Sequence, residues 1–310
     1  MTVAEKAEAL AWKIEFGGDA PVHWPASRAG FRLPVSWLAG EATEGIFPPV
    51  RPAGEAGGFR LFQAGELLLG CGLQPVGGTT ESAAREFYRR LLEAAGRRRL
   101  YRIWNYIPAI NERKNGLENY RAFSAGRAQA FEEKFGGGYR SMLPAASAVG
   151  CRGEAIAAVF AAGERAPRHV ENPEQVPAYH YPPQHGPRSP SFSRSTIAES
   201  GGRPVVFISG TAAIKGHATV APGALAAQLD CTLDNLRLIS VAAGVGERLG
   251  AGENFVRHFK IYLRRAGDLP AARARLAASL LRPADRVVWL QADLCRAGLV
   301  VEIEATLVGK

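Results

Sequence analysis

The hydrophobic positions in the first half of the chain follow two periods in turn. A spacing typical of an amphipathic helix covers Thr80 to Leu92, after a Thr-Thr-Glu start suited to an N-cap. The run LYRIWNYIPAI alternates as a strand does and stops at Pro108. A second helix is predicted over GLENYRAFSAGRAQAFEEKF, before three glycines, and EAIAAVFAAG is predicted to be a strand of small residues. The first half therefore predicts the order β-α-β-α-β.

The second half repeats this order from Val205 to Leu307. Its elements are VVFISGTAAI, LAAQLDCTLDNLRLISVAAG, VRHFKIYLRR, a further helix and VVWLQADLCRAGLVVEIEATL. The repeat predicts an α/β (α+β) fold of two tandem β-α-β-α-β units, each a mixed sheet with helices packed on one face. We expect the two sheets to lie edge to edge. Residues 1 to 60 are rich in Pro, Gly and Trp and predict only short strands.

The repeat divides the chain into three parts. We expect a first unit over residues 1–165, a connecting loop over 166–198 and a second unit over 199–310. Seven prolines lie between Pro167 and Pro190 and predict irregular structure. The loop also holds the aromatic and His-rich run YHYPPQH. It is therefore either an ordered loop that covers a binding site or an exposed connection between the units.

Only the second copy carries an acid at the centre of its last strand. Aligning the two Cys-Arg pairs, at residues 151–152 and 295–296, places Ala158 opposite Glu302. A duplicated unit that keeps an acid in one copy and lacks it in the other indicates one working site rather than two. The sequence therefore singles out Glu302.

Strand alternation places Glu302 on the face opposite the one that packs on the helices. The polar face of VRHFKIYLRR carries His258, Lys260, Tyr262 and Arg264. If the two strands are neighbours, the acid lies among cations and a phenol. The pattern has two interpretations: a solvent-facing sheet with salt bridges, or a site for an anionic substrate with a carboxyl group that moves a proton.

Other segments offer residues that could bind a ligand. Tyr120 and Arg127 lie seven residues apart, on one face of a predicted helix. Arg194 follows the Pro-rich loop, and an arginine can bind a carboxylate through two hydrogen bonds. The turn in VVFISGTAAIKGH has small residues that let a ligand approach the backbone, although it matches no phosphate-binding loop. These turn residues are Gly210, Thr211 and Ala212.

Composition and charge narrow the class of protein. The chain is 47% hydrophobic and 22% charged, as soluble globular proteins are. It shows neither a membrane-length apolar run nor a signal peptide. Four dispersed cysteines without a CxxC pair indicate free thiols in the cytoplasm and disfavour a metal site. The net charge of +9 fits a solvated basic face, nucleic acid or a small anion. Because no nucleic-acid motif surrounds arginines 97–99, we expect no nucleic-acid partner.

Six segments together resemble the chorismatase family, whose members cleave chorismate in polyketide starter-unit and hydroxybenzoate biosynthesis. They are LYRIWNYIPAIN, GLENYRAFSAGR, LPAASAVG, SPSFSRS, FISGTAAIKGH and CRAGLVVEIEA, spread over two thirds of the chain. The second half is also similar to the Rid family of enamine/imine deaminases, in AAQLDCTLDNLRLISVAAG and VEIEA. Chorismatases share that fold, so the resemblance implies two tandem Rid-like units.

The resemblance implies a substrate, chorismate, and a reaction without cofactor or metal. In LVVEIEA, the glutamate that matches the family's catalytic acid is Glu302. Arg127, Arg194 and Arg264 are the candidates for binding the two substrate carboxylates. Tyr120 and Thr211 are candidates for binding the hydroxyl and ether oxygens. The resemblance leaves open a monomer or a small homo-oligomer.

The motifs are mixed with respect to the product. A Cys seven residues before the glutamate, here Cys295, goes with hydroxybenzoate formation in the family, whereas Ala212 is more typical of the hydrolytic enzymes. We expect pyruvate and 3-hydroxybenzoate, with some 4-hydroxybenzoate as a further option. The alternatives are hydrolysis to a dihydroxycyclohexadiene carboxylate, a Rid-type deaminase, and a small-anion or nucleic-acid binding protein without catalysis.

Overall fold

Two mixed sheets with the same strand order form the centre of the protein in this computed structural model, which describes residues 10–23, 29–47, 49–252 and 255–310. One sheet has the order β12-β9-β13-β8-β7-β6 and the other β20-β19-β21-β16-β15-β14, with β4 added beside β20. In both sheets the first two strands of this order pair in parallel. The predicted class, mixed sheets with helices on one face, is confirmed.

The strand bounds are as follows. The first sheet comprises β6 (Arg51–Ala56), β7 (Phe59–Ala64), β8 (Leu67–Pro75), β9 (Arg99–Pro108), β12 (Ala145–Cys151) and β13 (Ala155–Gly163). The second sheet comprises β4 (Ser36–Gly40), β14 (Arg168–Val170), β15 (Ser195–Ser200), β16 (Arg203–Ala212), β19 (Phe255–Leu263), β20 (Arg286–Gln291) and β21 (Val301–Gly309).

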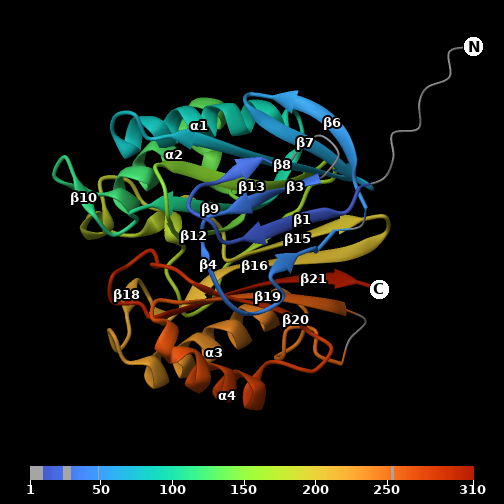
Figure 1. The fold of residues 1–310 in the computed structure, drawn as a ribbon, viewed down its shortest axis with the longest axis vertical. Coiled ribbons are helices and arrows are strands. Elements are labelled where there is room, and N and C mark those ends of the chain that lie inside the picture. Colours follow the sequence, from blue (N-terminus) through green and yellow to red (C-terminus); the bar gives the residue numbers. More distant parts are fainter. Residues whose placement is uncertain (1–9, 24–28, 48, 253–254) are drawn as a thin grey trace, which may run out of the picture.

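Helices cover the outer face of each sheet, as Figure 1 shows. On the first sheet lie α1 (Thr80–Ala95) and α2 (Asn119–Phe135), and on the second lie α3 (Leu225–Ala242) and α4 (Leu269–Ser279). The Thr79 side chain caps α1 by accepting a hydrogen bond from the Ser82 amide. The apolar residues of each helix pair pack on alternate positions of the strands beneath them and form two separate outer cores.

The inner faces of the two sheets pack against each other together with a small N-terminal sheet. That sheet comprises β1 (Trp12–Phe16), β2 (Val22–His23), β3 (Ala29–Leu33) and β5 (Thr43–Glu44). Figure 1 shows its strands β1 and β3, in blue, between the two larger sheets. Trp12 meets Phe62 of the first sheet at 5.2 Å between ring centroids, and Phe47 meets Phe207 of the second at 6.5 Å. The N-terminal residues therefore complete the central core.

Three expectations are corrected by this arrangement. The sheets meet face to face rather than edge to edge, because each has one face on its helices and must bury the other. Within each predicted β-α-β-α-β order the structure adds one strand before the last, β12 or β20, and each sheet is extended by further strands outside that order. Ala158 faces the helices, whereas Glu302 faces the opposite sheet. The alignment of the two copies at their Cys-Arg pairs is therefore wrong by one residue at this strand, since neighbouring residues face opposite sides of a sheet. The residues on either side of Ala158, Ala157 and Val159, face inward and are also apolar, so the first copy still lacks the acid.

The remaining elements are short. They are β10 (Arg113–Lys114), β11 (Leu117–Glu118), β17 (Ile214–Lys215), β18 (Ala218–Thr219), and the 3₁₀ turns η1 (Gly136–Met142), η2 (Ala178–His180), η3 (Pro183–His185) and η4 (Ala266–Asp268). The Pro-rich segment is irregular apart from η2 and η3, although β14 and the start of β15 fall within the range 166–198 predicted as a loop. Among the described residues, no helix is both long and apolar enough to cross a membrane.

Candidate active site

A cavity of about 510 Å³ lies where the Pro-rich segment crosses the ends of β16 and β21, a size suited to a small organic ligand. The residues that line it come from four stretches of the chain, 111–121, 181–194, 210–219 and 295–302. They are Asn111, Arg113, Glu118, Tyr120, Arg121, Tyr181, Gln184, His185, Pro190, Phe192, Arg194, Gly210, Ala212, Ile214, His217, Ala218, Thr219, Cys295, Arg296, Ala297 and Glu302. The Pro-rich segment therefore forms part of a pocket wall.

Glu302 reaches this cavity from β21 and is only 3% exposed. Its neighbour on β16 is Ala212, beside a register shift that lies between Ile208 and Thr211. Gly210 lies in that shift, and a Cβ atom there would be 2.0 Å from Glu302 Oε1. The absence of a side chain at Gly210 thus makes the room for the carboxyl group.

The environment of Glu302 favours its neutral form. Burial and then the negative charge of Glu304 raise the pKa of Glu302 to about 8, and Arg102 and Arg194 oppose this rise. Within the described part of the chain, the Glu302 carboxyl has no ion pair with a cation. At neutral pH the cavity therefore holds a carboxylic acid that can donate a proton.

Glu304, two residues further along the same face, has the opposite environment. Its Oε2 atom accepts hydrogen bonds from Arg102 Nη2 at 2.7 Å and Ser147 Oγ at 2.5 Å. Its Oε1 atom lies 2.9 Å from Lys260 Nζ, which also donates to Glu44 Oε2 at 2.8 Å. Burial raises the pKa of Glu304, but Lys260 and then Arg102 lower it by more, so it lies below its ordinary value.

Six of the residues proposed from the sequence line the cavity together: Tyr120, Arg194, Gly210, Ala212, Cys295 and Glu302. Arg194 donates through Nη2 to the Tyr181 hydroxyl at 2.6 Å and lies over the Phe192 ring. Burial and then Glu302 raise the pKa of the Cys295 thiol to about 12, so the thiol is neutral. A neutral thiol contributes an apolar surface rather than a nucleophile.

Five other residues proposed from the sequence do not line the cavity. Lys260 is in the ion pairs described above, and the buried Tyr262 belongs to the central core. The Thr211 hydroxyl donates to the Ser209 carbonyl oxygen at 2.9 Å. Arg127 is buried against the rings of Tyr88 and Phe131, with Nε and Nη2 unpartnered among the described residues.

Arg264, the fifth of these, holds the loop that carries Cys295. Its guanidinium donates to the carbonyl oxygens of Leu299 at 2.7 Å and Arg296 at 2.9 Å, and forms an ion pair with Asp293 at 2.5 Å. These contacts use the donors that would bind a substrate carboxylate. In this structure Arg264 therefore fixes one wall of the cavity from behind.

The structure also brings in residues that the sequence analysis did not propose. Arg296 lies over the Tyr181 ring at 5.3 Å, and its Nη1 donates to the His217 carbonyl oxygen at 2.9 Å. His217 and His185 are joined by a ring-nitrogen contact of 3.0 Å that links the β17–β18 connection to the Pro-rich segment. In the sequence, the only indication that Arg296 would line the cavity was its position directly after Cys295.

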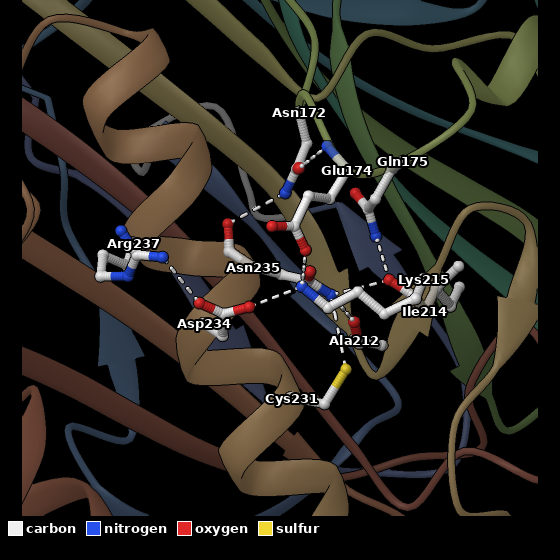
Figure 2. A network of polar contacts seen from close by, with 10 residues as sticks. All are labelled: Asn172, Glu174, Gln175, Ala212, Ile214, Lys215, Cys231, Asp234, Asn235 and Arg237. Carbon is white, nitrogen blue, oxygen red and sulfur yellow. Dashed lines mark hydrogen bonds and ion pairs between the residues drawn. The ribbon is translucent and has the colours of Figure 1, made fainter.

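A polar network behind β17 positions the turn that bears Ala212, as Figure 2 shows. Asn235 of α3 donates through Nδ2 to the carbonyl oxygens of Ala212 and Ile214, both at 2.9 Å. Gln175 donates to the same Ile214 oxygen at 2.8 Å, and Lys215 joins Glu174 to α3. The network connects the turn and the Pro-rich segment to α3. These two segments, which both line the cavity, are therefore held in place by the same helix.

Metal-ligating side chains are not clustered in the part of the chain that the structure describes: it holds no group of three or more His, Cys, Asp or Glu residues able to bind an ion. His185 and His217 have no carboxylate partner among those residues. The ionisable groups that line the cavity are the two acids Glu118 and Glu302, arginines, two histidines, two phenols and a thiol.

Three comparisons relate this chain to known proteins. Residues 48–162 match the family model described as "Chorismatase FkbO/Hyg5-like, N-terminal". The chain is 38% identical over 271 residues to a 3-hydroxybenzoate synthase of Streptomyces hygroscopicus, covering 82% of this chain and 77% of that protein. It is 34% identical over 267 residues to a chorismatase of Streptomyces rapamycinicus, covering 83% and 79%. A crystal structure of a chorismatase superposes with a TM-score of 0.80 at 31% identity, over 99% of this chain and 95% of that one.

Proposed function

The chain belongs to the chorismatase family, and we propose that it converts chorismate into 3-hydroxybenzoate and pyruvate without a cofactor, with Glu302 as the general acid. One observation carries this proposal. A buried carboxyl group that is neutral at pH 7 faces a cavity that also holds three arginines, Arg113, Arg194 and Arg296, without an ion pair among the described residues. This combination suits a dianionic substrate that must be protonated on carbon.

The proposed role of Glu302 follows from the chemistry of the enolpyruvyl ether. Protonation of its methylene carbon gives an oxocarbenium-like centre, and the bond between ring carbon C3 and the ether oxygen then breaks to release pyruvate. For the 3-hydroxy product, the neighbouring C4 hydroxyl oxygen bonds to C3 as pyruvate leaves, and the C4–O bond of the resulting epoxide then opens; without this transfer the product is 4-hydroxybenzoate. A general acid of pKa about 8 holds its proton at neutral pH and yet gives it up more readily than water does. When the ring becomes aromatic it loses a proton, which the resulting carboxylate can accept.

Arg194 and Arg296 are our candidates for the two substrate carboxylates. Both lie against the Tyr181 ring, and both line the cavity. Neither forms an ion pair within the described part of the chain, so each can form a charge-assisted hydrogen bond to a carboxylate. Tyr120, whose pKa is raised by burial, remains protonated and can donate to a substrate oxygen. Arg127 stays a prediction from the resemblance, because it is buried outside the cavity lining.

The balance of atoms supports a reaction without a cofactor. Chorismate has the same elemental composition as hydroxybenzoate and pyruvate together, so the conversion needs neither water nor an oxidant. Cys295 and Phe192 give the cavity apolar surface, which offers no hydrogen bond to hold an attacking water. This favours the aromatic product over hydrolysis, in agreement with the interpretation of Cys295.

The test is to incubate the purified protein with chorismate in metal-free buffer and to identify the products by chromatography with mass detection. We expect pyruvate and 3-hydroxybenzoate in equal amounts. A dihydroxycyclohexadiene carboxylate would mean that Ala212 is the better guide to product type. Unchanged chorismate would contradict the proposal and direct attention to an imine substrate.

The pH dependence of the reaction provides a further prediction. Because Glu302 acts in its protonated form and its pKa is raised to about 8, kcat/KM for chorismate should be level near pH 7 and decline above about pH 8. The decline should approach tenfold per pH unit. Initial rates measured from pH 6 to 10 check this, and a rate that rises steadily to pH 10 would contradict an acid of this pKa.

A further inference from the structure

Glu302 and Glu304 lie two residues apart on one strand and therefore face the same side of the sheet, about 7 Å apart along the backbone. Both are buried, yet only Glu304 contacts cations among the described residues. Arg102 reaches it from the first sheet and Lys260 from the neighbouring strand β19. The pair therefore consists of one carboxylate fixed by ion pairs and one carboxyl group without them.

The charges of this cluster are balanced without Glu302. Glu304 and Glu44 carry two negative charges, and Arg102 and Lys260 carry two positive charges. Ionising Glu302 would add a negative charge beside that of Glu304, and Arg194, which acts on Glu302 from the cavity, forms no ion pair with it among the described residues. A buried unpaired charge is strongly unfavourable, so this arrangement favours the neutral acid.

We propose that Glu304 is a positioning residue whose buried negative charge, fixed by Arg102 and Lys260, keeps Glu302 in its acid form between turnovers. This inference rests on the proposed function for its catalytic meaning. Besides Glu304, the charges that act on Glu302 are those of Arg102 on the first sheet and Arg194 in the cavity, and the Cys295 thiol and the Tyr262 phenol lie beside it. The thiol and the phenol are neutral, and both arginines act in the opposite direction to Glu304, so Glu304 is the one negative charge among these groups.

A purely structural role for the cluster is the competing explanation, because Arg102 and Glu304 join the two sheets. The two roles differ in what substitutions do to Glu302. Glu304→Gln removes a negative charge, so Glu302 should ionise at lower pH. Arg102→Met removes a positive charge while Lys260 still neutralises Glu304, so Glu302 should ionise at higher pH. Loss of structural support predicts lower stability in both variants without opposite shifts.

The experiment follows the Glu302 carboxyl directly. Infrared difference spectra between each protein and its Glu302→Gln counterpart report the C=O band of the protonated acid as a function of pH, without substrate. We expect the midpoint to move down by about one pH unit or more in Glu304→Gln and up in Arg102→Met. Asp285→Asn is the matched control, because the ion pair of Arg257 on β19 with Asp285, directly before β20, is also buried but does not line the cavity.

The outcomes are decisive in either direction. Opposite shifts, with an unchanged midpoint in Asp285→Asn, support the inference; midpoints that stay at the wild-type value, or move in the same direction in both variants, overturn it. If one variant does not fold, the infrared midpoint of the other decides: a shift in the expected direction supports the inference, and no shift or the opposite shift overturns it. The pH profile of kcat/KM should move with the infrared midpoint. Opposite infrared shifts in a protein that leaves chorismate unchanged would refute the proposed function while preserving the charge coupling.

Discussion

Replacing Glu302 by Gln is expected to lower kcat for chorismate by about 10³-fold, within the range that a general acid contributes. Gln fills the same volume beside Gly210 but has no acidic proton to donate. KM should change little, because the proposed carboxylate ligands Arg194 and Arg296 are untouched. Stopped assays of pyruvate formation by the variant and the wild type measure both constants, and a variant that keeps near-normal turnover would remove Glu302 from its proposed role.

The same variant has a second readout, in stability. The pKa of Glu302 is raised in the folded protein from about 4.5 to about 8, so its contribution to stability is fully present below pH 4.5 and is lost as pH rises towards 8. The Gln variant lacks this component, so its unfolding free energy should fall less between pH 5 and 8. Glu247→Gln, at an exposed position, serves as the control. It should match the wild type in kcat and in the pH dependence of its unfolding free energy.

Replacing Gly210 by Ala is expected to lower kcat by about 10²-fold through displacement of Glu302. The new Cβ atom would lie 2.0 Å from Glu302 Oε1, 2.7 Å from its Cδ atom and 3.1 Å from Ser147 Cβ. The carboxyl group must therefore rotate or β21 must move, and overpacking of this kind costs about 1–3 kcal/mol. Steady-state kinetics and denaturant unfolding measure the two effects.

Gly137→Ala provides the matched control for this substitution. Gly137 lies in η1, and an added Cβ there would meet no atom within 4 Å. This variant should keep wild-type kcat and stability to within a few tenths of a kcal/mol. A Gly210→Ala protein with unchanged kcat would show that the carboxyl group does not need the position that it occupies here.

Much of the fold could be read from local patterns, because periodicity encodes which face of an element is apolar. The alternation in LVVEIEATL predicted that Val301, Ile303 and Ala305 face the helices, and they pack in the core under α3 and α4. The same alternation predicted that Lys260 and Tyr262 face the side of Glu302, which the pairing of β19 with β21 confirms. Residues without a clear period, such as the N-terminal strands, were predicted only as short strands.

The candidate site was harder to predict, because its lining depends on where chain segments end rather than on their period. Among the proposed arginines, Arg194 lines the cavity, whereas Arg264 is held by backbone carbonyl groups behind its wall. Arg296 lines it although the sequence analysis did not propose it as a ligand. An arginine side chain is long enough to face either side of a loop, so its position in the sequence does not decide what it contacts.

The sequence by itself determined the duplicated order of strands and helices, the acid present in only one copy, and the face of β21 from which that acid projects. Only the tertiary structure decided that this face is buried against a second sheet rather than exposed to solvent. It also decided that Arg102 and Glu44, 202 and 216 residues away from Glu304 and Lys260, are the partners of these charges. The physical reason is that periodicity specifies which side chains share one face of a strand or helix. The pKa of Glu302 depends instead on burial and on charges that distant segments of the chain supply.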